Sequence, residues 1–253
     1  MVENRLHIPV STTAGDGVRW SLCAVGDVCA LNDESEPRAI TERFGPDLMS
    51  LIHRSELSIV NLEAPTCRCD KRIPKSGPAM RMDESVPAGL RQIGFDVATL
   101  ATNHTMDFGR DGLAETLSQC RKAGLLTCGA GVTRKEALEG LTIEPAEGLR
   151  VCVLAFCEQE FGIALDGAPG TAWLSASDVP REIARAKQVS DVVIAVAHGG
   201  VEIVPLPPPQ RCEQLRGLID AGATLVIGHH PHVPHGWEHY HDGTILYSLG
   251  NCL

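Results

Sequence analysis

The chain has 253 residues, of which 43% are hydrophobic and 21% are charged, and its formal net charge at pH 7 is −10. These proportions are typical of a globular domain that buries a sizeable core, and they exclude a disordered or collagen-like chain. The acidic balance disfavours contact with a phosphate backbone, so we expect no nucleic acid among the partners of the chain.

The sequence contains no apolar run long enough to cross a bilayer, and no apolar core of a secretory signal follows Met1. We therefore expect a cytoplasmic protein without a membrane anchor. The 10 cysteines are scattered, which favours reduced thiols over a disulfide framework. Cys67 and Cys69 form a single C-x-C pair, and the lack of a second pair at zinc spacing argues against a structural zinc site there.

Apolar runs and helical spacings alternate along the chain, with turn residues between them. In chain order they predict a strand at 20–25, a helix at 38–54, a strand at 57–60, a loop at 68–85, a helix at 86–93, a strand at 95–101, a helix at 112–123, a strand at 151–156, a helix at 178–188, a strand at 191–197, a proline-rich loop at 205–209, a helix at 210–221, a strand at 224–227 and a hairpin at 233–249. Asp178 is the expected N-cap of its helix, and Asp242-Gly243 the expected turn of the hairpin. Strands separated by helices predict βαβ units in a single α/β domain over residues 1–253.

Polar side chains follow five of the predicted strands, at the end of the sheet where ligands bind in folds of this kind. They are Asp27 after the first strand, Asn61 and Glu63 after the second, Asn103 and His104 after the third, His198 and Glu202 after the fourth, and His229, His230 and His232 after the fifth. Carboxylate, amide and imidazole ligands in this mixture suit divalent Zn, Mn or Fe, and a carboxylate can bridge two such ions. Each residue alone has a simpler explanation as a turn, a helix cap or a surface histidine. Their common position after buried strands predicts a site for one or two divalent transition metal ions.

Six short segments occur in an order and spacing that a known family shares. They are Ala24-Val25-Gly26-Asp27, Asn61-Leu62-Glu63, Ala101-Thr102-Asn103-His104 with Asp107 and Gly109, His198-Gly199-Gly200-Val201-Glu202, Gly228-His229-His230-Pro231-His232-Val233, and Ser248-Leu249-Gly250-Asn251. This pattern resembles the CapA-type family of poly-γ-glutamate capsule biosynthesis (PGA_cap), which looks like a branch of the calcineurin-like metallophosphoesterases. The resemblance covers nearly the whole chain.

The resemblance implies a four-layer αββα fold, in which two packed mixed sheets are flanked by helices. It implies metal ligands at six positions, namely Asp27, Glu63, Asn103, His198, His230 and His232. Glu63 would bridge two ions, His104 would be the general acid, and Asp107 would orient His104. The remaining positions would support the ligands or contact the substrate, and they are Asn61, Glu202, His229 and Asn251.

Two features depart from the family pattern. The wider superfamily has a histidine two residues after the first aspartate, where this chain has Cys29. We expect Cys29 to line the first metal pocket without binding the ion, because a thiol must lose its proton before it can bind. Family members often continue beyond the Ser-Leu-Gly-Asn segment and many carry a membrane anchor, whereas this chain ends at Leu253, so its role is expected to differ from that of the capsule proteins.

Three functions remain open at this point. The first is a metal-dependent hydrolase that attacks a phosphate ester with a metal-activated water, while His104 protonates the leaving oxygen. The second is metal-assisted chemistry at an amide or carboxylate of a glutamyl or peptide-like substrate. The third is a non-catalytic assembly subunit of a capsule-type complex, against which His104 argues, because a structural metal needs no acid.

The substrate, whether a small molecule or a polymer, is expected to be anionic. Five basic residues of the predicted loop at 68–85 are the best candidates for binding it, and they are Arg68, Lys71, Arg72, Lys75 and Arg81. The glycine-rich segment Cys128-Gly129-Ala130-Gly131 lacks the third glycine of a dinucleotide-binding turn, which favours a plain turn there.

Overall fold

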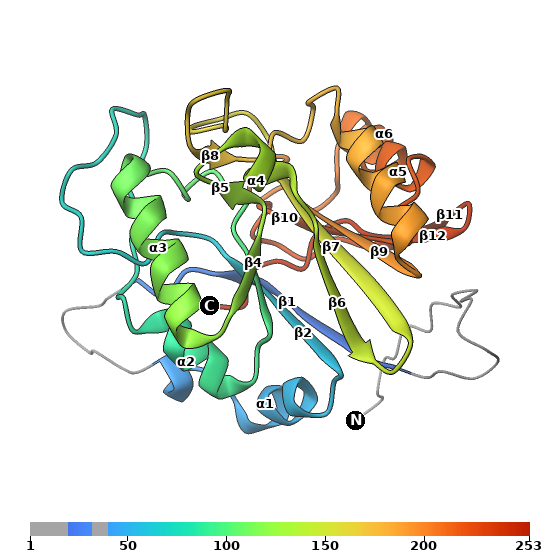
Figure 1. Ribbon diagram of the computed structural model, residues 1–253, viewed down its shortest axis with the longest axis horizontal. Coiled ribbons are helices and arrows are strands. Elements are labelled where there is room, and N and C mark those ends of the chain that lie inside the picture. Colours follow the sequence, from blue (N-terminus) through green and yellow to red (C-terminus); the bar gives the residue numbers. More distant parts are fainter. Residues whose placement is uncertain (1–19, 32–39) are drawn as a thin grey trace.

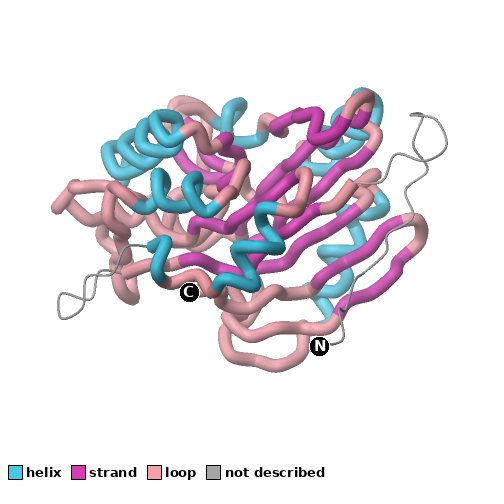
Figure 2. Tube along the Cα trace, turned by 90° about the horizontal axis from the view of Figure 1, so that it is seen from below, coloured by secondary structure: helices cyan, strands magenta, loops and turns pink. Residues whose placement is uncertain are grey.

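Two sheets packed face to face, with helices on both outer faces, form the protein in the computed structural model, which describes residues 20–31 and 40–253 (Figure 1). Seen at right angles in Figure 2, the strands run through the middle of the molecule and helices lie outside them. This arrangement confirms the four-layer α/β fold that the family resemblance implies.

The first sheet has four strands in the order β1-β2-β3-β4, and all of its strand pairs are parallel. The resemblance implies a mixed sheet here, so the parallel pairing throughout the described strands is a difference in detail. The strands are β1 Leu22–Val28, β2 Leu57–Leu62, β3 Val97–Thr99 and β4 Leu126–Cys128. Its outer face is covered by the 3-10 helix η1 Ile40–Glu42 and by α1 Pro46–His53, α2 Val86–Ile93 and α3 Gly109–Ala123.

The second sheet is mixed and has six strands in the order β11-β12-β10-β9-β7-β6. Its strands are β6 Leu141–Ala146, β7 Leu149–Cys157, β9 Val192–His198, β10 Leu225–His229, β11 Trp237–Tyr240 and β12 Gly243–Leu246. Its outer face is covered by α4 Arg134–Leu138, α5 Val179–Val189 and α6 Pro209–Asp220. Two short strands, β5 Ala130–Gly131 and β8 Gly170–Thr171, pair separately.

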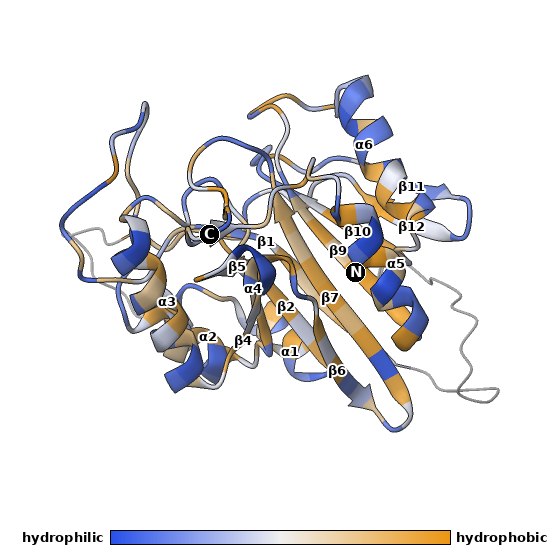
Figure 3. Cartoon of the chain, turned by 45° about the horizontal axis from the view of Figure 1, so that its top comes forward, coloured by the Kyte–Doolittle hydropathy of each residue, from blue (hydrophilic) through white to orange (hydrophobic). Residues whose placement is uncertain are grey.

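Strand β7 shows why the sequence forms two apolar layers. Val151 and Val153 face the first sheet, whereas Leu154 and Phe156 face the helices on the other side. Side chains alternate between the two faces of a strand, so a strand that is covered on both faces consists of apolar residues throughout. Figure 3 shows this continuous apolar character in β7 and β9, and the mixed character of the covering helices.

The C-terminal segment joins the two sheets at the ends of β10 and β1. The amide of Leu249 donates a hydrogen bond to the Gly228 carbonyl oxygen at 3.2 Å, and the amide of Asp27 donates one to the Gly250 carbonyl oxygen at 2.9 Å. A Cβ atom at Gly26 would lie 2.1 Å from the Gly250 oxygen, and one at Gly228 would lie 2.1 Å from the Tyr247 oxygen. Only glycine therefore fits at these two crossings.

Several predicted elements differ from those observed. The single helix expected at 38–54 is wrong, because η1 and α1 are separated at Gly45-Pro46, where Gly45 is extended with φ −68° and ψ 152°. Proline disfavours a helical conformation in the residue before it, which explains the break. Residues 38–39 lie outside the described residues.

Strand β1 also continues through Asp27, and the residues Gly26-Asp27 do not end it. Asp178 occupies the N-cap position of α5 without a capping hydrogen bond, because its side chain accepts one from Arg134 at 2.8 Å. The hairpin at 233–249 is confirmed by β11 and β12, but its two-residue turn is His241-Asp242. Strands β4, β5, β6 and β8 and helix α4 were not predicted.

Within the described ranges, no helix combines the length and apolar character that crossing a membrane requires.

Candidate metal centre

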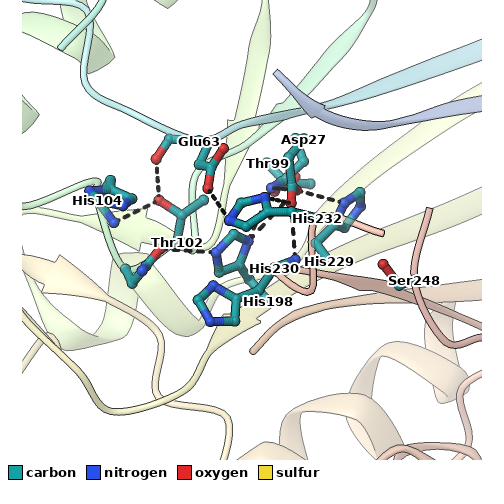
Figure 4. Close-up of polar contacts among 12 residues, drawn as sticks. Asp27, Glu63, Thr99, Thr102, His104, His198, His229, His230, His232 and Ser248 are labelled. Carbon is teal, nitrogen blue, oxygen red and sulfur yellow. Dashed lines mark hydrogen bonds and ion pairs between the residues drawn. The ribbon is translucent and has the colours of Figure 1, made fainter. Parts of the chain in front are cut away.

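The carboxyl ends of the strands bring the predicted site residues to one edge of both sheets. In the first sheet, Asp27 of β1 pairs in register with Asn61 of β2. In the second sheet, His198 at the end of β9 pairs with His229 at the end of β10. Figure 4 shows Asp27 and Glu63 turned toward the imidazoles of the second sheet. The two sheets therefore contribute different ligand types to one place.

Asp27 is the most contacted carboxylate of this cluster. Its Oδ1 accepts a hydrogen bond from Asn61 Nδ2 at 2.8 Å and lies 2.9 Å from His229 Nδ1. Its Oδ2 accepts one from the His230 amide at 3.0 Å and lies 3.4 Å from His232 Nδ1. Burial acts to raise the pKa of Asp27, but the neighbouring His229 and His232 outweigh burial and hold that pKa well below its usual range. Asp27 is therefore a fixed negative charge.

Glu63 and His232 complete one side of the cluster. Glu63 Oε1 lies 3.5 Å from His232 Nε2, and ligand atoms of Asp27, Glu63 and His232 all lie within 4.8 Å of one another. Burial, followed by the charge of Asp27, raises the pKa of Glu63 to about 7. The hydrogen bond with Asp27 raises the pKa of His232 to about 9. His232 Nδ1 is also 2.7 Å from Asn251 Oδ1, which orients the ring with Nε2 toward Glu63.

Asn103, His198 and His230 form the other side. Asn103 Oδ1 lies 3.0 Å from His198 Nε2, and the rings of His198 and His230 have centroids 5.0 Å apart. Burial holds the pKa of His198 well below its ordinary value and also lowers that of His230. Both imidazoles are therefore neutral at pH 7, which is the form that binds a metal. Glu202 lies 3.9 Å from His230 Nε2, at the exposed rim.

The chemistry of these residues fits a cation. Glu63 Oε1 and His230 Nδ1 are buried, and neither has a hydrogen-bond partner in the part of the chain that the structure describes. Each such atom costs about 1–3 kcal/mol, which a bound ion would offset. His230 and His232 also adopt positive φ angles of 94° and 59°. Backbone strain of this kind in residues other than glycine is concentrated at functional sites.

His104 and Asp107 lie beside Glu63. His104 Nδ1 is 2.7 Å from Asp107 Oδ2, and Asp107 is fully buried. Thr102 links the pair to the cluster, since its hydroxyl donates to the Glu63 carbonyl oxygen at 2.6 Å and accepts from the His104 amide at 3.3 Å (Figure 4). The structure thus holds an imidazole with an orienting carboxylate next to the proposed ligands.

The structure brings all twelve predicted site residues into this one region. Cys29, in contrast, is absent from the groups of potential ligands that the described residues form, although it follows β1 two residues after Asp27. Burial, followed by the charges of Glu63 and Asp27, raises the pKa of the Cys29 thiol to about 12. The thiol is therefore protonated at neutral pH.

Two residues near the site were not predicted there. Glu160 lies 3.1 Å from Asn103 Nδ2 and 3.7 Å from His230 Nε2. Its position shortly after β7 is the same signal that identified the other residues. Lys75 was assigned to a solvent-exposed loop, but its side chain is only 3% exposed and pairs with Asp107. No pattern in the loop sequence indicated that burial.

The C-x-C pair has a third neighbour that the sequence did not indicate. Cys67, Cys69 and Glu115 have potential ligand atoms within 4.8 Å of one another. Cys69 Sγ donates to Glu115 Oε1 at 3.1 Å, and the other oxygen of Glu115 accepts from the Arg68 amide at 2.7 Å. Hydrogen bonds therefore account for this group.

Comparison with known proteins gives a family match over nearly the whole chain. The model of the family described as bacterial capsule synthesis protein PGA_cap matches residues 21–253. A capsule biosynthesis protein CapA of Bacillus anthracis is 29% identical over 250 residues, covering 93% of this chain and 60% of the relative. The PGA biosynthesis protein CapA of Bacillus subtilis is 32% identical over 224 residues, covering 85% and 58%.

A probable polyglutamine synthesis accessory protein of Mycobacterium tuberculosis is 28% identical over 213 residues, covering 79% of this chain and 56% of the relative. The chain therefore spans less than two thirds of the length of these relatives. The family model nevertheless matches from the start of the first sheet to the last residue. The chain belongs to the bacterial capsule synthesis protein family PGA_cap, which is a metallophosphoesterase-like family.

Proposed function

We propose that this chain is a metal-dependent hydrolase that acts on a phosphate ester. One observation carries the proposal, namely that oxygen ligands of the first sheet and imidazoles of the second converge beside a buried His104–Asp107 pair. A structural metal site needs ligands alone, whereas a hydrolase also needs a group that handles a proton. This convergence therefore favours catalysis over an assembly role.

The proposed ligands divide into two sets around Glu63. Asp27 and His232 would hold one ion, Asn103, His198 and His230 would hold the other, and the unpartnered Oε1 of Glu63 lies between them. Ions bound there would lower the pKa of a water and neutralise the charge that develops on the phosphoryl oxygens. Zn, Mn and Fe are all compatible with this ligand mixture.

The protein's own residues supply the remaining tasks. Asp107 accepts the Nδ1 proton of His104 and so leaves Nε2 to face a substrate oxygen. His104 would donate a proton to the leaving oxygen, which prevents an alkoxide from forming. Asn61 and His229 restrain Asp27, and Asn251 restrains His232, so the ligands are oriented before an ion binds.

A second candidate is metal-assisted chemistry at an amide or carboxylate of a glutamyl polymer. The names of the relatives favour it, because they refer to capsule and polyglutamate or polyglutamine synthesis. Glu202 and Glu160 at the rim argue against close binding of a polyanion at the His230 side, because like charges repel. We therefore rank the phosphate ester first.

Metal analysis followed by a substrate panel tests the proposal. The purified protein should contain one or two equivalents of a transition metal, measured by mass spectrometry. The protein loaded with Mn, Fe, Zn or Co should then hydrolyse aryl phosphate mono- or diesters in preference to γ-glutamyl amides. Release of amine from the amides without hydrolysis of any phosphate would favour the second candidate. A protein that binds metal but turns over neither class would contradict both.

A further inference from the structure

The buried Lys75 ammonium lies at the centre of contacts between the loop at 68–85 and the His104–Asp107 pair. Its side chain is 3% exposed, and its Nζ pairs with Asp107 Oδ1 and lies 3.2 Å from His104 Nδ1. The Phe161 ring covers it from the other side, with its centroid 4.8 Å from Nζ. The other basic side chains of the loop differ, since Arg68 is 79% and Arg81 42% exposed.

Asp107 holds this loop through three separate contacts. Besides the ion pair with Lys75, its Oδ2 accepts a hydrogen bond from the Met80 amide at 2.7 Å, and its carbonyl oxygen accepts one from the Ile73 amide at 2.9 Å. The same Oδ2 lies 2.7 Å from His104 Nδ1. One carboxylate therefore fixes both the loop and the imidazole, and Lys75 provides the positive charge that pairs with it.

A fully buried carboxylate without a cation is strongly unfavourable, so removing Lys75 would leave Asp107 as an uncompensated charge. Asp107 would then recover hydrogen bonds by turning toward water or toward the Met80 amide, and its bond to His104 would change. We propose that Lys75 is a positioning residue for His104, which acts by holding Asp107 in the orientation that directs His104 Nε2 to the substrate. This inference rests on the proposed function of His104 as the acid.

Two other roles for Lys75 predict different behaviour. If Lys75 binds an anionic substrate, its loss should raise KM to a similar extent for all esters. If Lys75 only anchors the loop, its loss should lower stability without affecting one type of ester more than another. A positioning role predicts a lower kcat that depends on the leaving group, because only a poor leaving group needs a proton from His104.

The kinetic test compares Lys75→Met and Lys75→Gln with the wild type on phenyl phosphate and 4-nitrophenyl phosphate. With phenyl phosphate, we expect kcat to fall about 10–100-fold in Lys75→Met, at unchanged KM and metal content. The loss with 4-nitrophenyl phosphate should be several-fold smaller. Lys75→Gln, which can still donate to Asp107, should recover part of the loss. In a His104→Ala background, Lys75→Met should have no further effect.

Lys122→Met removes an exposed lysine near the end of α3 and is the matched control, which should behave as the wild type. A readout without turnover keeps the inference testable if the esters are not substrates. In the zinc-loaded protein, long-range ¹H–¹⁵N spectra should show His104 as the Nδ1–H tautomer, and Lys75→Met should shift both ring nitrogens. Unchanged ring nitrogens, equal losses on the two esters, or additive effects with His104→Ala would each overturn the positioning role.

Discussion

The two sheets contribute to the candidate centre in different chemical terms. The parallel first sheet supplies oxygen atoms from Asp27, Glu63 and Asn103, together with the proposed acid His104. The mixed second sheet supplies imidazole nitrogens from its neighbouring strands β9 and β10. Neither sheet alone presents the mixture of oxygen and nitrogen ligands that a borderline transition metal prefers. The packing of the sheets is therefore a condition for the site, and mutations on either side should reveal this dependence.

The largest effect should come from removing one ligand on each side. Glu63→Ala removes an oxygen ligand of the first sheet and His198→Ala an imidazole of the second, and each should lose most of the bound metal and all hydrolysis. Both should remain folded, because each substitution removes a buried polar group and leaves the apolar layers intact. Metal content and circular dichroism measure the two properties.

His239→Ala replaces an exposed histidine on β11 and should keep its metal, which controls for the general affinity of histidine-rich protein. Full metal occupancy in both Glu63→Ala and His198→Ala would disprove the site. Loss in only one of them would assign the ions to a single sheet.

The next largest effect concerns the acid on the first sheet. His104→Ala should retain the metal but lose turnover on a poor leaving group by roughly 10²–10⁴-fold, the usual contribution of general acid catalysis. Single-turnover assays on phenyl phosphate, with metal content measured in parallel, separate the two effects. Full activity of this variant on phenyl phosphate would show that His104 is not the acid.

Much of this division could be predicted from the sequence, since the ligands follow buried strands. Asp27, His198 and His230 stand directly after apolar runs, and the carboxyl ends of neighbouring parallel strands meet at one edge. Strand β6 was missed because it is half-exposed and contains Pro145, both untypical of a buried strand.

Other features depend on contacts that no local pattern encodes. The burial of Lys75 is set by Asp107, which is 32 residues away in the chain. The crossing of the C-terminal segment is set by the close approach of Gly250 to Gly26. Such contacts between distant segments appear only once the fold is known.

A smaller effect is expected from the glycines that let the C-terminal segment join the sheets. Gly26→Ala and Gly228→Ala would each place a Cβ atom 2.1 Å from a backbone oxygen, so the segment must shift. We expect each to lower the free energy of unfolding by about 1–3 kcal/mol, as overpacking does. Gly217→Ala is the matched control, because nothing lies within 4 Å of its Cβ position in α6 and the change should be neutral or stabilising. Denaturant unfolding that shows no difference among the three variants would contradict the close crossing.

The smallest effect is expected at Cys29, where the wider superfamily has an imidazole. The thiol is half-buried beside Glu63 and Asp27, and burial together with these charges raises its pKa to about 12, so the protonated form does not bind an ion at neutral pH. Cys29→Ser should therefore change metal content little. Cys29→His would add a neutral nitrogen ligand to the oxygen-rich side, and should slow the loss of the first ion to a chelator. If Cys29→Ser instead empties the site, the metal itself stabilises the thiolate, and such a soft ligand would favour zinc over manganese.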